Sequence, residues 1–210
     1  MSNKIRMPSQ ERREAIIAAA ITLFSQKGFR GTTTREIAAA VGVSEPVLYQ
    51  HFTTKSELYA AIIEYKSMEG EAKFGHLLDS ALESDDDHTF FAALGTIIIR
   101  WYTEDPAYAR LLLYSALEGH ELSTLCYERQ GKHLHRKVSE RIRRRIEQGA
   151  MRETDTLLAA RAFIGMIAHT AQAAVVFHSR LLDSANLAKD LESMIDIFLG
   201  GLSRNQKGKK

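Results

Sequence analysis

The sequence predicts an all-α protein, and three observations favour this class. Apolar residues recur with the 3.6-residue period of an α-helix along almost the whole chain. Residues that commonly cap helices stand where these periodic segments begin, as Ser9, Thr33 and Ser44 do. The chain of 210 residues holds only three prolines and 8% aromatic residues, which favours long helices over sheets.

The overall composition is typical of a globular protein. Hydrophobic residues make up 45% and charged residues 26%, so the chain is neither a disordered tail nor a membrane bundle. No apolar run approaches the roughly 20 residues that span a bilayer, and the first nine residues are polar, so we expect a soluble, cytoplasmic protein. The single cysteine, Cys126, excludes an internal disulfide and a cysteine-rich zinc site.

The first helix is expected over Gln10–Gln26, with Ser9 as its N-cap. One face of this segment is apolar and contains Ile16, Ile17, Ala20 and Phe24. Gly28 is expected to end the helix in the left-handed conformation, which glycine adopts without steric cost.

Two short helices are expected next. Thr33 and Glu36 have the spacing of a capping box, which starts a helix that ends at Gly42. Ser44 caps a third helix that ends near Phe52. The apolar residues of this segment that point inward are Ile37, Ala38, Val41, Val43, Leu48 and Phe52. Two short helices with a glycine at the bend and a shared apolar side are typical of a helix-turn-helix.

The rest of the chain is expected to be helical as well. Thr54 and Glu57 form a second capping box, and the long fourth helix that they start is taken to about Leu82. Further helices are expected at about Thr89–Thr103, Pro106–Leu117, Leu122–Gln148, Thr156–Leu182 and Asn186–Leu202.

The segment from Ile16 to Leu58, which includes GFRGTTTREIAAAVGVSEPVLYQHFTTKSEL, resembles the DNA-binding domain of the TetR family of bacterial transcriptional regulators. The match extends over more than forty residues, and the remainder resembles the family only in its helical architecture. The resemblance implies an N-terminal three-helix DNA-binding domain at residues 1–54. A larger helical domain for ligand binding and dimerisation would occupy residues 55–210.

The resemblance also implies roles for particular residues. Tyr49 and His51 stand where the family contacts phosphates, and Lys55 stands where the N-terminus of the fourth helix meets the DNA backbone. The positions that match contacts to bases or phosphates are Thr33, Thr34, Arg35, Ser44, Glu45, Val47 and Gln50. Many relatives carry a glycine or a basic residue where this chain has Glu45 and Pro46, so the base pairs read there do not transfer.

The last two expected helices suggest a dimer interface. The small residues of the penultimate helix, which allow another helix to approach closely, are Ala159, Ala160, Ala162, Gly165, Ala168, Ala171, Ala173 and Ala174. The apolar stripe of the last helix consists of Leu187, Leu191, Met194, Ile195, Phe198, Leu199 and Leu202. The resemblance implies a homodimer that binds a pseudo-palindromic double-stranded operator. The alternative is that both helices pack wholly within one monomer.

A pocket for an unknown small-molecule effector is expected among the middle helices. Its candidate lining residues are Trp101, Tyr102, Tyr108, Leu112 and Tyr114, with His169 and Gln172 as polar groups. A mostly apolar wall with few polar anchors is typical of small-molecule sites. The alternatives are that the aromatic residues are plain core and that His169 is a satisfied buried histidine or an interface residue.

The formal net charge of +2 hides an uneven distribution. Residues 1–60 carry +3, residues 61–128 carry −9, residues 129–152 carry +7 and residues 153–210 carry +1. A mildly basic DNA-binding domain would therefore be attached to an acidic helical body. The acidic segment leaves a cationic effector open, and the basic run Lys132–Arg145 is either a solvated helix face or a second nucleic-acid contact.

The sequence predicts a regulator rather than an enzyme. No phosphate-binding glycine loop, nucleophile elbow or H-E-x-x-H motif is present, and His133 and His135 point in different directions on a helix. We therefore expect no catalytic residues, no metal and no cofactor. The expected function is repression with release by an effector. Activation, a helical enzyme and a ligand-binding adaptor without DNA binding remain as alternatives.

Overall fold

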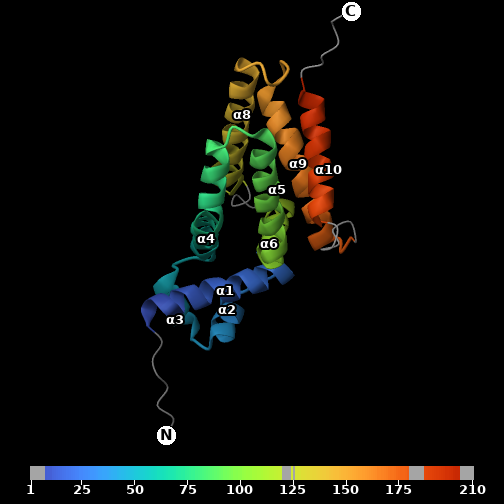
Figure 1. The fold of residues 1–210 in the computed structure, drawn as a ribbon. Helices are drawn as coiled ribbons and strands as arrows, with labels where there is room; N and C mark the ends of the chain where they lie inside the picture. The colour runs from blue at the N-terminus through green and yellow to red at the C-terminus, as the bar shows by residue number, and fades with distance from the viewer. Residues whose placement is uncertain (1–7, 120–123, 125, 180–186, 204–210) are drawn as a thin grey trace, which may run out of the picture. The chain divides into compact units, whose positions relative to one another are not determined.

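The computed structural model describes residues 8–119, 124, 126–179 and 187–203, and Figure 1 shows that they are helical. The helices are α1 (Ser9–Lys27), α2 (Thr34–Val41), α3 (Glu45–His51), α4 (Lys55–Glu83), α5 (Asp87–Glu104), α6 (Pro106–Leu117), the short π-helix η1 (Tyr127–Gly131), α8 (Lys132–Glu147), α9 (Thr156–Val176) and α10 (Leu187–Leu202). These residues contain no strand beyond one isolated bridge between Met151 and Ser203, so the all-α prediction is confirmed.

The chain forms two compact units, and neither is continuous in sequence. The first unit comprises Met1–Glu69 and Ala107–Cys126, and the second comprises Gly70–Pro106 and Tyr127–Lys210. Helix α4 runs without a break from the first unit into the second. The borders of these units differ from those of the functional domains expected at residues 1–54 and 55–210. The functional division stays a prediction.

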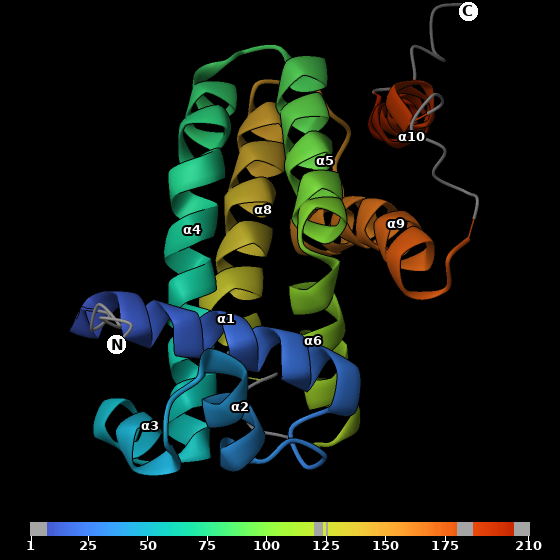
Figure 2. The same ribbon diagram turned by 90° about the horizontal axis from the view of Figure 1, so that it is seen from below.

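The first unit consists of α1, α2, α3, the beginning of α4, and α6. Helix α2 packs against both α1 and α3 (Figure 2). The apolar face predicted for α1 is buried, since Ile16, Ile17, Ala20 and Phe24 are all fully inaccessible. The rings of Phe24, Phe29 and Tyr59 form an aromatic cluster with centroid distances of 5.0 to 5.7 Å, which packs α1 onto α4.

The two ends of α1 differ from the prediction. Ser9 is the first helical residue rather than the N-cap, because the carbonyl of Pro8 already accepts the amide of Arg12 at 3.0 Å. Gly28 ends the helix with a φ of 72°, but its ψ of 176° is extended rather than left-handed helical. This conformation leads the chain past Glu118, whose carboxylate occupies the place that a Cβ on Gly28 would take.

The caps of the next helices are mostly those expected. Thr33 and Glu36 form the complete capping box of α2, and Gly42 ends it in the left-handed conformation with φ 74° and ψ 30°. At α4 the box is only half formed, because the Glu57 carboxylate accepts the amide of Thr53 at 2.7 Å rather than that of Thr54. The Thr53 hydroxyl donates to the same oxygen at 2.6 Å, which favours this arrangement.

Several later helix ends were also predicted imperfectly. Helix α5 starts two residues earlier than expected, since Asp86 accepts the amides of the next turn. The segment expected from Leu122 to Gln148 is divided into η1 and α8, and Leu122 lies outside the described residues. Helix α9 ends at Val176 because His178 has a φ of 50°, while the expected end at Leu182 and the start of the last helix at Asn186 lie outside the described residues.

The second unit is built around α9. This helix packs against α5, α8 and α10, and α10 also packs against α5. The rings of Phe91 of α5, Phe163 of α9 and Phe198 of α10 contact one another, with centroids 4.7 to 5.0 Å apart. By length and composition α9 could also cross a membrane, although 39% of its most apolar window is buried inside the protein. The core helix of a globular protein passes the same test, and Phe163 and Ile167 are fully buried in this core.

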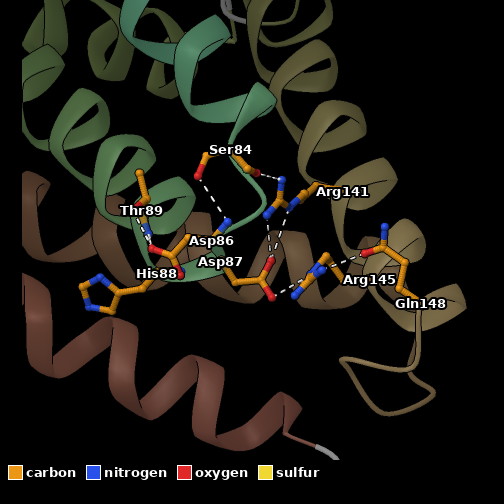
Figure 3. A network of polar contacts seen from close by, with 8 residues as sticks. All are labelled: Ser84, Asp86, Asp87, His88, Thr89, Arg141, Arg145 and Gln148. Atoms are coloured by element: carbon orange, nitrogen blue, oxygen red, sulfur yellow. Dashed lines mark hydrogen bonds and ion pairs between the residues drawn. The ribbon is translucent and has the colours of Figure 1, made fainter.

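A buried charge network fastens α8 to the start of α5 (Figure 3). The side chain of Arg141 is 2% exposed, and its Nη2 donates to Asp87 Oδ1 at 2.9 Å. Its Nη1 donates to the carbonyl of Ser84. Arg145 donates to the other oxygen of the same carboxylate at 2.8 Å and to Gln148 at 2.7 Å. The basic run of α8 is therefore not entirely a solvated face, because these two arginines point inward.

Replacing Asp87 by alanine is expected to destabilise the second unit by about 3 to 5 kcal/mol, since the buried Arg141 would lose its counter-charge. Urea unfolding followed by the fluorescence of Trp101 reports on this unit, because the chain has one tryptophan and it lies in α5. The matched control is Asp85→Ala, which removes an exposed carboxylate from the loop just before α5. Equal unfolding midpoints for the two variants would contradict the prediction.

Candidate nucleic-acid interface

Helices α2 and α3 form a helix-turn-helix whose inner side is buried. Ile37 and Leu48 are fully inaccessible, and Ala38 is nearly so. The amide of Val43 donates to the carbonyl of Ala38 at 3.0 Å, which closes the turn after the left-handed Gly42. Of the six inward positions that sequence periodicity predicted, Ile37, Ala38, Leu48 and Phe52 are buried, whereas Val41 and Val43 are half-buried.

The ten residues predicted to contact DNA all belong to the first unit. Nine of them lie on α2, on α3 or directly before these helices, and Lys55 is the first residue of α4. The exposed members are Thr33, Arg35, Ser44, Tyr49 and Gln50, and the half-buried members are Thr34, Glu45, Val47, His51 and Lys55. Their contacts with DNA stay predictions.

Three of these residues are joined by a hydrogen-bonded chain across the two helices. The Thr34 hydroxyl of α2 donates to Glu45 Oε1 of α3. The Tyr49 hydroxyl lies 3.2 Å from the same Thr34 oxygen, and the Tyr49 side chain is 44% exposed. Because the single hydrogen of Thr34 goes to the carboxylate, Tyr49 is the donor in the second contact. The carboxylate of Glu45 is thus the final acceptor of the chain.

Lys55 has contacts within the first unit that its predicted role did not include. Its Nζ donates to the carbonyl of Phe29 and lies 4.1 Å from the centroid of the Phe29 ring. Burial lowers the pKa of Lys55, while the charges of Glu118 and Glu36 oppose this shift. Lys55 therefore helps to hold the turn between α1 and α2.

Glu118 is a functional candidate that the sequence did not reveal. Its carboxylate accepts the amide of Phe29 at 2.9 Å and that of Arg30 at 3.4 Å. These residues are 88 and 89 positions apart from it in the chain, so no local pattern could have indicated the contact. The carboxylate after the end of α6 thereby holds the turn that precedes the helix-turn-helix.

An exposed ion pair supports the start of α2. Lys27 Nζ lies 2.7 Å from Glu36 Oε1, and this hydrogen bond is the largest of the causes that lower the pKa of Glu36 to about 2. The amide and hydroxyl of Thr33 contribute further. Because the folded-state pKa is lowered, the stabilisation is present above pH 4.5 and is lost as the pH falls toward 2.

The predicted effector residues are divided between the two units. Trp101 and Tyr102 of α5 and His169 and Gln172 of α9 belong to the second unit. The α6 residues Tyr108, Leu112 and Tyr114 belong to the first. A common pocket for all seven stays a prediction.

The burial of these residues corrects one alternative. His169 is exposed on α9, so it is not a buried core histidine, and the possibility that it lies in an interface remains. Tyr108 is only 2% exposed, which agrees with a core or pocket position, whereas Tyr114 is 38% exposed.

Two family models match this chain. Residues 16–62 match the model described as "Bacterial regulatory proteins, tetR family". Residues 94–201 match the model described as "AefR-like transcriptional repressor, C-terminal domain". The first match contains the whole helix-turn-helix, and the second extends over more than half of the chain.

Individual relatives agree with these matches. The HTH-type transcriptional activator FasR of Mycolicibacterium smegmatis is 46% identical over 59 residues, which are 28% of this chain and 27% of FasR. The regulator AcrR of Shigella flexneri is 38% identical over 81 residues, which are 35% of this chain and 38% of AcrR. The chain thus spans well under half the length of these two curated relatives.

The fold has counterparts among solved structures. The structure of AibR in complex with isovaleryl coenzyme A and operator DNA has a TM-score of 0.65 with this chain. The comparison covers 88% of this chain and 97% of AibR at 24% sequence identity. At this identity the likeness concerns the fold alone.

Replacing Lys27 by methionine is expected to raise the pKa of Glu36 from about 2 toward the ordinary value of 4.5, because the largest stabiliser of the carboxylate is lost. Carbon-13 NMR titration of the side-chain carboxyl groups measures this directly. Glu57 is the internal control, since its lowered pKa depends first on Thr53 and not on Lys27. An unchanged Glu36 midpoint would show that the ion pair has no such effect.

Proposed function

Because the chain belongs to the TetR family of bacterial regulatory proteins, we propose that it binds a double-stranded operator as a homodimer and represses transcription until a small-molecule effector releases it. The observation that carries the proposal is the helix-turn-helix with a buried inner side and a polar, solvent-accessible outer side. Residues 1–54 are the DNA-binding domain in this proposal. Residues 55–210 carry effector binding and dimerisation.

The outer side of α3 is proposed to enter the major groove. Gln50 and Val47 would face base edges, while Tyr49 and His51 would contact the phosphate backbone. On binding, the Tyr49 hydroxyl would turn its hydrogen from Thr34 to a phosphate oxygen. Thr33 and Arg35 at the start of α2 would anchor further phosphates. The first 60 residues carry only +3, so one copy would bind DNA weakly and two copies would bind it more tightly.

The homodimer is proposed to form through α9 and α10, but not through the whole predicted stripe of α10, because Leu191, Ile195 and Leu202 are buried within the monomer. On α9, Leu158 is 59% exposed, and Ala162 and Gly165 are exposed beyond it at helical spacing. A Cβ added to Gly165 would contact nothing within 4 Å, so a second helix could approach there. On α10, Ile197 is 71% exposed. A two-fold dimer would place its recognition helices about 34 to 36 Å apart, which is one turn of DNA.

The effector is proposed to act by preferring one of two arrangements of the DNA-binding domains. An effector shifts such an equilibrium only by its differential affinity for the two states. Helix α4 is the proposed lever, because it is continuous between the two units. AibR has been solved with both a coenzyme A thioester and operator DNA, which supports a ligand-responsive regulator of this fold.

Activation is the second candidate function, because FasR, which is 46% identical over the matched segment, is named as an activator. The C-terminal family model is named for a repressor and favours repression. Either function would take place in the cytoplasm, where bacterial operator DNA is found. Selection of bound DNA from a random library by the purified protein tests the proposal. Failure to enrich any sequence would contradict it.

Replacing Tyr49 by alanine is expected to weaken operator binding by at least about tenfold, because a contact to the DNA backbone is removed. The dimer should be unaffected. Affinity is measured by fluorescence anisotropy with the selected operator. The control is Tyr65→Ala on α4, since Tyr65 is 40% exposed and Tyr49 is 44% exposed. Wild-type affinity of the Tyr49 variant would show that the contact assignment is wrong.

Replacing Ile197 by glutamate is expected to convert the dimer into a folded monomer, because a charge would be buried in an apolar interface. Analytical ultracentrifugation at micromolar concentration gives the mass, and circular dichroism gives the helix content. Leu117→Glu serves as the control, since Leu117 is 86% exposed on α6. A wild-type monomer, or a dimer of the Ile197 variant, would exclude this interface.

A further inference from the structure

We propose that Glu45 determines operator specificity by accepting a hydrogen bond from a cytosine in each half-site. This inference rests on the proposed DNA-binding function and names one base that the protein would read. Glu45 is the first residue of α3, the helix that is proposed to enter the major groove.

The first step of the argument is the orientation of the Glu45 side chain. Its Oε1 accepts the hydroxyl of Thr34, which is 11 residues earlier and belongs to α2. Tyr49, one helical turn after Glu45, is joined to the same hydroxyl at 3.2 Å. The carboxylate is therefore held between two helices, and it loses less rotamer freedom on binding than an untethered glutamate would.

The second step is the hydrogen-bonding capacity of the carboxylate. An ionised glutamate accepts hydrogen bonds at about four lone-pair sites and donates none. The Thr34 hydroxyl uses one of these sites, and the Tyr49 hydroxyl directs its hydrogen to Thr34. Phosphates repel a carboxylate, so only base edges that present a donor can bind Glu45 favourably.

The third step is the chemistry of the major groove. The donors there are the N4 amino group of cytosine and the N6 amino group of adenine. Adenine carries its N7 acceptor beside N6, and this lone pair repels a carboxylate that approaches the amino group. Cytosine has no acceptor on its major-groove edge. A fixed carboxylate on the recognition helix therefore favours cytosine.

The alternative is that the hydrogen bond between Thr34 and Glu45 only ties α2 to α3. Glu45→Gln separates the two roles, because the amide oxygen can still accept from Thr34. A glutamine on the recognition helix pairs with the N6 and N7 atoms of adenine. In this variant the hydrogen bond from Thr34 would persist, while the preferred base would change from cytosine to adenine. Glu45→Ala would accept all four bases at that position.

The experiment is selection of bound DNA from a random library by four full-length proteins, followed by sequencing. They are the wild type, Glu45→Gln, Glu45→Ala and the control Glu64→Gln, which removes one exposed carboxylate from α4. The wild type and the control are expected to select cytosine at one position of each half-site, preferred at least about tenfold. Glu45→Gln should select adenine at that position alone, and Glu45→Ala should select no particular base there.

The outcomes separate this inference from the proposed function. An operator that is identical for the wild type and both Glu45 variants would overturn the role of Glu45 and leave the regulator intact. A wild type that enriches no sequence would overturn both. If the variants do not fold, the wild type is measured against operators in which each half-site cytosine is replaced by thymine. The inference fails if none of these replacements weakens binding by about tenfold.

Discussion

The Glu118 carboxylate helps to join the two chain stretches from which the first unit is built, together with the buried hydrogen bond from the Tyr59 hydroxyl to the Leu111 carbonyl. Glu118, just beyond α6, accepts the amides of Phe29 and Arg30 in the turn between α1 and α2. Gly28 suits this turn, because its φ of 72° is one that residues with a Cβ rarely adopt and an added Cβ would displace the carboxylate. Lys55 at the start of α4 donates to the carbonyl of Phe29, so the same turn is held from α4 as well. The orientation of the helix-turn-helix therefore depends on the ends of α4 and α6, both of which belong to its own compact unit.

The fold could be predicted from the sequence wherever a signal is local. Helix α2 begins at the capping box of Thr33 and Glu36 and ends at Gly42, and both ends were predicted from these local residues. The apolar period likewise predicted the buried faces. Glu118 could not be recognised, because its partners lie 88 and 89 residues away. Asp87 precedes the helix expected from Thr89, but its pairing with two arginines of α8 depends on packing that no local pattern encodes.

The candidate interface was predictable in its residues but not in its connections. Family resemblance selected ten positions, and all of them belong to the first unit, on or before α2 and α3 and, for Lys55, at the start of α4. The resemblance did not predict that Thr34 connects Glu45 with Tyr49, because these hydrogen bonds form only when α2 and α3 pack together. The effector residues are less well defined, since the pattern of aromatic residues on α5 and α6 describes a core as well as a pocket.

The same dependence on carboxylates changes how the charge of the chain is interpreted. Segment sums assign −9 to residues 61–128, yet Asp86, Asp87 and Glu118 of this segment accept amides or guanidinium groups of the protein itself. A cationic effector therefore gains little support from the segment charge of −9.

Hydrogen bonds also lower the pKa values of Glu36, Glu57 and Asp86. Since each folded-state pKa lies below its unfolded value, these contacts stabilise the protein at neutral pH and weaken as acid protonates them. Helix starts in both units thus depend on ionised carboxylates.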